Sequence, residues 1–122
     1  MRMRGMLLAA AVLALAAPVQ AQPVAAGPGP EEDLRCAAWA AVVLGLNKDD
    51  PEAAAGLGMA LAWFLARYEG ATGKRFEEAM TAEFVDGLVP EMEAIELTCQ
   101  PRMQAMGARF SDWGAKLQQA GQ

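Results

Sequence analysis

The pair of cysteines, Cys36 and Cys99, constrains the fold of this chain more than any other feature. They are the only two cysteines in 122 residues and lie 63 positions apart. Each falls on an apolar stripe of helical spacing, so both are expected to face inward. In an oxidising compartment we expect them to pair. A cross-link that closes a loop of this length stabilises a small domain by about 4 kcal/mol.

The amino terminus has the layout of an export signal. Residues 1–5 carry two arginines and no acid, and Met6–Ala17 is an uncharged run of twelve residues. Pro18 follows, and Ala21 ends a short segment that suits signal cleavage. The apolar run is well short of the roughly 20 residues that span a bilayer. We therefore predict a signal peptide over residues 1–21, a periplasmic or secreted protein, and no stable membrane span after cleavage.

The next segment, residues 22–30, holds three prolines and two glycines. Such a composition does not support a regular hydrogen-bonded structure. We interpret it as a disordered linker. Residues 31–122 then form one helical domain with a modest core.

Two start signals open the first half of this domain. Pro30 precedes three consecutive acids, which the dipole of a helix favours in its first turn. Asp50 and Pro51 form a capping residue and a first helical residue. We expect the second helix to end at Gly70. Residues 53–66 carry no charge, so this second helix is predicted to be the central and most buried one.

The second half predicts two more helices. Phe76 and Phe84 fall on one face of a third helix, which Gly87 ends or bends. Apolar residues then continue in steps of three and four to the end of the chain, which predicts one long helix. Pro101 either kinks this helix or breaks it, with Thr98 as a new cap. The fold class is therefore all-α: a small bundle of four helices with one disulfide, the last helix long and kinked or broken near Pro101.

Charge and composition exclude several functions. The chain has 15 acids and 10 bases, and loss of the two signal-peptide arginines leaves a net charge of −7. This surface repels nucleic acid and anionic membranes. The chain has no histidine, and Ser111 is its single serine. We predict no enzyme, no cofactor and no metal. Glu83 and Glu91 are the remaining carboxylate pair that an enzyme would need.

Two groups of side chains are candidates for function. One is a pH-sensitive cluster of acids without a base between them, for which a solvated helical face is the alternative interpretation. The other is a Met-rich and aromatic binding face on the last helix, for which core packing is the alternative. The acidic cluster comprises Glu83, Asp86, Glu91, Glu93 and Glu96, and the binding face comprises Met92, Met103, Met106, Phe110 and Trp113.

Two resemblances add to these patterns. The segments around Cys36, the run from Ala62 to Arg67 and Cys99 to Met103 resemble a group of short exported two-cysteine helical proteins of sphingomonad-type bacteria. This resemblance implies export and a helical fold, and it implies no activity. The layout of the two cysteines, with Trp113 near the end, is similar to that of the periplasmic acid-stress chaperones. That second resemblance implies a chaperone function.

These observations lead to two hypotheses of function. The first is a non-enzymatic periplasmic helical binding protein that acts as an acid-responsive holdase-type chaperone, with apolar faces exposed on dimer dissociation or partial unfolding. The second is a constitutive structural or interaction module of the cell envelope with a specific protein partner. In both cases the partner is a protein or a second copy of this chain.

Overall fold

The structure, a computed structural model, describes residues 27–122. The predicted signal peptide, residues 1–21, and residues 22–26 of the predicted linker lie outside this range. Within it the chain is helical and contains no strand, so the all-α prediction is confirmed. The helices are α1 (Pro30–Leu46), α2 (Pro51–Thr72), α3 (Phe76–Ala79), α4 (Ala82–Leu88) and α5 (Met92–Ala120), with a 3-10 turn, η1 (Val89–Glu91), before α5.

The start signals of α1 and α2 act as predicted. Pro30 is the first residue of α1. At the start of α2, the Asp50 side chain accepts a hydrogen bond of 3.2 Å from the backbone N–H of Ala53. The predicted end of α2 at Gly70 is wrong, because the helix continues to Thr72 and ends at Gly73, whose φ of 68° is left-handed. Glycine adopts this conformation without steric cost, which makes Gly73 the natural stop.

The predicted third helix is two short helices, α3 and α4. Met80 leaves the helical conformation, and the hydroxyl of Thr81 accepts a hydrogen bond of 3.1 Å from the backbone N–H of Phe84. This cap starts α4 one turn later. Gly87 does not end α4, which leads through η1 at Pro90 into α5.

The long last helix is confirmed, and it passes through Pro101 as one element of 29 residues. Of the two alternatives at Pro101, a restart with Thr98 as a new cap is therefore not the one adopted. Pro101 has no N–H to donate to Leu97, so one hydrogen bond of the helix is missing there.

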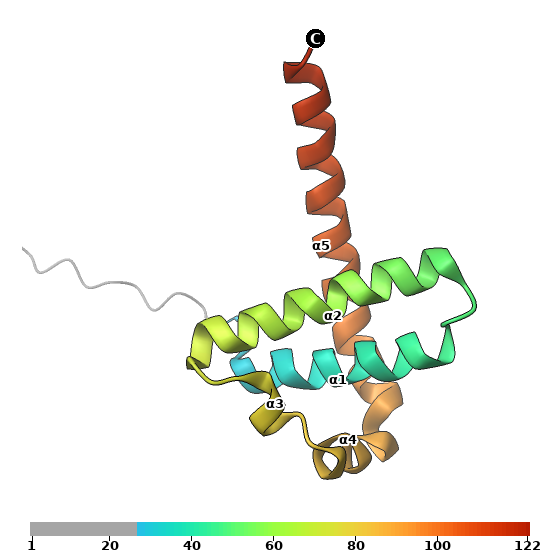
Figure 1. The fold of residues 1–122 in the computed structure, drawn as a ribbon, viewed down its shortest axis with the longest axis vertical. Coiled ribbons are helices and arrows are strands. Elements are labelled where there is room, and N and C mark those ends of the chain that lie inside the picture. The colour runs from blue at the N-terminus through green and yellow to red at the C-terminus, as the bar shows by residue number, and fades with distance from the viewer. Residues whose placement is uncertain (1–26) are drawn as a thin grey trace, which may run out of the picture.

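Helices α1 and α2 form an antiparallel hairpin, and α5 crosses it (Figure 1). The first half of α5 packs against α1. In Figure 1, α3 and α4 lie below α1, and α3 also contacts α2. The second half of α5 extends past α2 and stands out from the rest of the molecule (Figure 1). We call residues 107–120 the arm and the remaining described residues the body.

The centre of the body is α1, where the predicted central helix was α2. Every residue from Cys36 to Ala40 is buried, which is more than one full turn of helix. Burial all round at these positions follows from contacts with α2 on one side and α5 on another. Helix α2 buries a single stripe, made by Leu57, Ala60, Phe64 and Tyr68. Its opposite face is exposed, although it carries no charge, and includes Ala55, Met59, Ala62 and Ala66.

The predicted Cys36–Cys99 disulfide is present, with the two Cα atoms 5.3 Å apart. Both residues are buried in the core. The bridge joins the first half of α1 to the first half of α5. It therefore anchors the helix whose far end is the arm.

Candidate functional site

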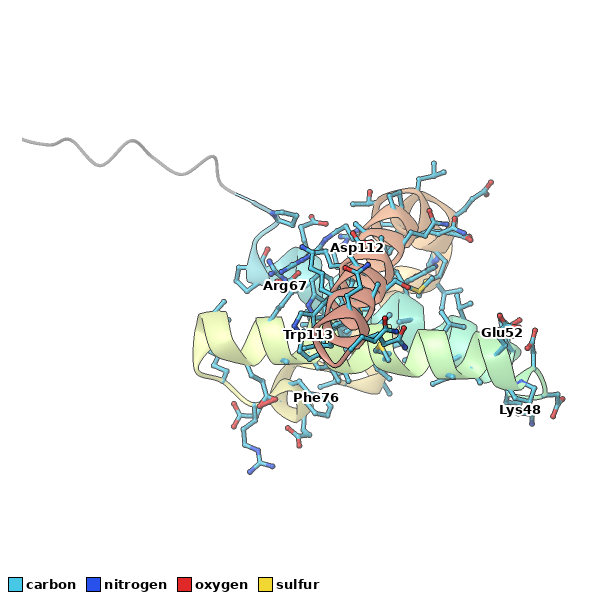
Figure 2. The ribbon with its side chains drawn as sticks, turned by 90° about the horizontal axis from the view of Figure 1, so that it is seen from above. Lys48, Glu52, Arg67, Phe76, Asp112 and Trp113 are labelled. Carbon is cyan, nitrogen blue, oxygen red and sulfur yellow. A yellow bond between two sulfur atoms is a disulfide. The ribbon has the colours of Figure 1, made fainter. Side chains whose placement is uncertain are left out.

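A groove lies where the arm leaves the body. It has a volume of about 530 Å³ and is bordered by α2 on one side and α5 on the other. In Figure 2, which looks along α5 from above, Trp113 of α5 lies at α2. The lining side chains are Trp63 of α2 with Met106, Arg109, Phe110, Asp112, Trp113 and Lys116 of α5.

The apolar side chains of the arm are exposed. Phe110 is 48% exposed, Trp113 is 61% exposed and Leu117 is 52% exposed. Their spacing of three and four residues places them on one face of α5, in line with buried Met106. The stripe that buries the first half of α5 thus continues along the arm, where no other helix of the body covers it.

Charged side chains accompany this stripe. Arg109 and Lys116 are seven residues apart, so they lie on the same flank of the arm. Asp112 lies on the same side, one turn from each. Among residues 27–122, none of these three side chains takes part in an ion pair.

The predicted binding face is divided by the structure. Met106 is buried in the core, and Met92 and Met103 are half-buried against it. Phe110 and Trp113 are the two members that reach the groove with exposed surface.

Two side chains of this surface were not among the predicted face, Leu117 and Trp63. Leu117 continues the same spacing, so the sequence pattern could have included it in the face. Trp63 comes from another helix, and only the crossing of α2 and α5 brings it to the groove.

A buried ionic cluster lies beneath the groove, and the sequence patterns did not predict it. Asp33 is 2% exposed. Its carboxylate oxygen Oδ1 accepts a hydrogen bond from Arg102 and a second, of 3.3 Å, from Nε of Arg67. A carboxylate so deeply buried needs such partners, because an unpaired buried charge is strongly unfavourable.

The guanidinium of Arg102 joins three helices. It lies 4.9 Å from the ring centre of Phe64 and 5.8 Å from that of Trp63, both in α2. One of its nitrogens also lies 3.5 Å from Sγ of Cys36 in α1. Cation–π contacts of this kind favour a guanidinium over an ammonium. Arg102 therefore holds the base of the arm against the hairpin.

One signal in the sequence could have revealed this cluster. Asp33 precedes Cys36 by three residues, and Arg102 follows Cys99 by three. Residues three apart on a helix share a face. When the helices cross at the disulfide with these ends toward each other, as they do here, the two opposite charges meet.

The predicted acidic cluster is spread over α4, η1 and the first turns of α5. All five carboxylate side chains are exposed. Within residues 27–122, Glu91 is the one member of this cluster that forms an ion pair. Its Oε2 atom lies 3.6 Å from a guanidinium nitrogen of Arg35. A second hollow of about 220 Å³ lies nearby, between the starts of α1 and α5 and beside the disulfide.

The side chains considered for catalysis lie apart from the groove. Glu83, Glu91 and Ser111 are all exposed, and none of them lines it. Residues 27–122 contain no group of three or more acidic or cysteine side chains placed to hold a metal ion. In the same range, no helix combines the length and the apolar character needed to cross a membrane.

In comparisons with known proteins, no family model, no curated protein and no solved structure matches this chain.

Proposed function

We propose that this protein is a non-enzymatic, exported helical binding protein that engages a protein partner through the groove between α2 and the arm. The observation that carries the proposal is the exposed apolar stripe of the arm, Phe110, Trp113 and Leu117, beside Trp63. Exposed aromatic side chains that lie together typically mark a binding site in a small protein.

The stripe is exposed in the folded molecule, which favours a constitutive interaction module over a switch. No unfolding is needed to present Trp113, because it is already 61% exposed. The amino-terminal pattern of residues 1–21 and the disulfide support a periplasmic or secreted location. The missing histidine supports a function in binding.

The acid-responsive holdase has weaker support. In that hypothesis, protonation of the acidic cluster activates the protein. The carboxylates of the cluster are exposed, however, and protonating a solvated carboxylate breaks few contacts. A holdase of this kind should reduce light scattering by an acid-unfolding client at about pH 3 and lose this effect when the disulfide is reduced. A constitutive module should leave that scattering unchanged.

The proposal is tested by site-specific photo-crosslinking in the cell envelope. A photoreactive phenylalanine analogue replaces Trp113 in one variant and Leu97 in a second. Leu97 is the matched control, because it is exposed and apolar on the same helix but outside the groove. We expect a discrete protein adduct from position 113 and none from position 97. Equal labelling from both positions, or no adduct from either, contradicts the proposal.

A further inference from the structure

The charge of the arm differs in sign from that of the body. Residues 107–122 contain two basic side chains, Arg109 and Lys116, and one acid, Asp112, for a net charge of +1. Residues 27–106 contain six basic and fourteen acidic side chains, for a net charge of −8. The exposed apolar stripe therefore lies on an arm of net positive charge, attached to an acidic body.

We infer that the groove binds an amphipathic helix of a protein partner that carries carboxylates along the edge facing Arg109 and Lys116. This inference rests on the proposed binding function and adds the chemistry of the partner. Helices dock into such grooves through apolar residues at spacings of three and four, and charges beside them set the choice of partner.

The shape of the site favours a helix over a flat lipid surface as the binding partner. The groove lies in the corner between α2 and the arm, which project in different directions (Figure 1). The exposed surface of α2 beside Trp63 includes the small residues Ala62 and Ala66, so a helix can approach closely there. A flat lipid surface cannot follow this corner, and the net charge of −8 on the body opposes an anionic one.

The charges disfavour a second copy of the arm as the occupant. In an antiparallel pair of arms, the flank of Arg109 and Lys116 faces the same basic flank of the other copy. In a parallel pair it faces the opposite flank, where Gly107 and Gly114 stand and no acid is present. The antiparallel arrangement provides a single carboxylate, Asp112, against two cations, and the parallel arrangement provides none.

The test uses two synthetic helical peptides and the oxidised mature chain that begins at Gln22. Both peptides lack tryptophan and carry leucines along one face. Glutamates flank that face in the first peptide and lysines flank it in the second. Binding is followed by the emission of Trp63 and Trp113, both of which line the groove.

We expect the glutamate peptide to bind about fivefold more tightly than the lysine peptide at low salt, as two solvent-accessible ion pairs allow. Added salt should reduce this ratio. The double variant R109E/K116E should reverse the preference. The control K48E/K74E changes the net charge equally at exposed sites outside the groove and should keep it. Lys48 lies at the far end of the α1–α2 hairpin (Figure 2).

The outcomes separate this inference from the function on which it rests. Equal affinities that are both lost in Trp113→Ser overturn the acidic partner and leave the binding function standing. Failure of both peptides to bind overturns both. Emission that responds to phosphatidylglycerol vesicles and to neither peptide overturns the inference in favour of a lipid surface. A dimer by sedimentation that Trp113→Ser dissociates overturns it in favour of a second copy.

Discussion

The two halves of α5 carry the same apolar spacing and have different surroundings. In the first half Ile95, Cys99 and Met106 are buried, and in the arm Phe110, Trp113 and Leu117 are about half exposed or more. The spacing of the apolar residues is the same in both halves, so it does not explain the difference in exposure. The difference arises because the contact of α1 and α2 with α5 ends between the two halves. The comparison shows that an apolar stripe predicts a contact, while the partner in that contact can be another part of the chain or another molecule.

The largest expected effect tests the anchoring of the first half. Cys36→Ala with Cys99→Ala should lower the free energy of unfolding by about 4 kcal/mol, because the unfolded chain regains the freedom of a long loop. Urea unfolding of the oxidised and double-variant proteins measures this loss. Chemical reduction of the wild type should produce a similar loss, and a change below about 1 kcal/mol in both would contradict the assigned role of the disulfide.

The ionic cluster at the base of the arm should come next. Asp33→Ala leaves Arg102 without its buried partner, and breaking such a pair costs about 3 kcal/mol. The control Glu31→Ala removes a neighbouring exposed acid from the same first turn of α1. We expect its effect to stay below about 1 kcal/mol. Similar losses in the two variants would show that Asp33 acts through the helix dipole and not through Arg102.

A smaller effect should appear within the arm. A Cβ atom at Gly107 meets no atom within 4 Å, so Gly107→Ala should stabilise the arm helix by up to about 1 kcal/mol. Slower hydrogen exchange of arm amides is the measurement. Gly73→Ala serves as the opposite case, because its φ of 68° strains any residue with a Cβ atom. Gly73→Ala should therefore destabilise the body. Faster hydrogen exchange of the arm amides in Gly107→Ala would contradict the prediction that a Cβ atom at Gly107 fits without a clash.

Substitution of an exposed aromatic residue in the arm should have almost no effect on stability. Trp113→Ala should change the free energy of unfolding by less than about 0.5 kcal/mol, since most of this side chain is exposed to solvent. Trp39, which is 2% exposed, is the matched tryptophan in the body. Trp39→Ala should cost about 4 kcal/mol. A comparable loss from both variants in urea unfolding would place the arm within the cooperative core.

The smallest effect concerns pH and lies outside both halves of α5. The pKa of Glu77 is lowered from 4.5 by a hydrogen bond with its own backbone and by Arg75. A lowered pKa in the folded state adds stability above the unfolded value, and this stability is lost as the pH falls through the folded value. Glu77→Gln should therefore be slightly less stable than the wild type at about pH 6 and equal to it at about pH 2. Thermal unfolding at both pH values compares them, and an equal difference at both would exclude the carboxylate charge as the cause.

Much of the fold could be predicted because its signals are local. Pro30, Asp50 and Pro51 start helices through their own backbone geometry and capping bonds, and these act over a few residues. The errors at Gly70 and Met80 are also local, because Gly73, three residues after Gly70, and Thr81, the residue after Met80, provide better caps. The disulfide was predictable from the predicted export and from the cysteine count, since no other cysteine competes for either partner.

The sequence by itself determined the helical fold, the cysteine pair and the apolar stripe of the last helix, because periodicity and capping depend on neighbours along the chain. Tertiary structure alone decided that α1, and not the uncharged α2, occupies the centre, and that Arg102 meets Asp33. It also decided that Trp63 joins the arm to form a groove. The physical reason is that these features depend on which helix crosses which and where the crossing ends. A helix with an apolar face buries that face in every arrangement of the helices. Contacts between residues far apart in the chain decide which arrangement forms.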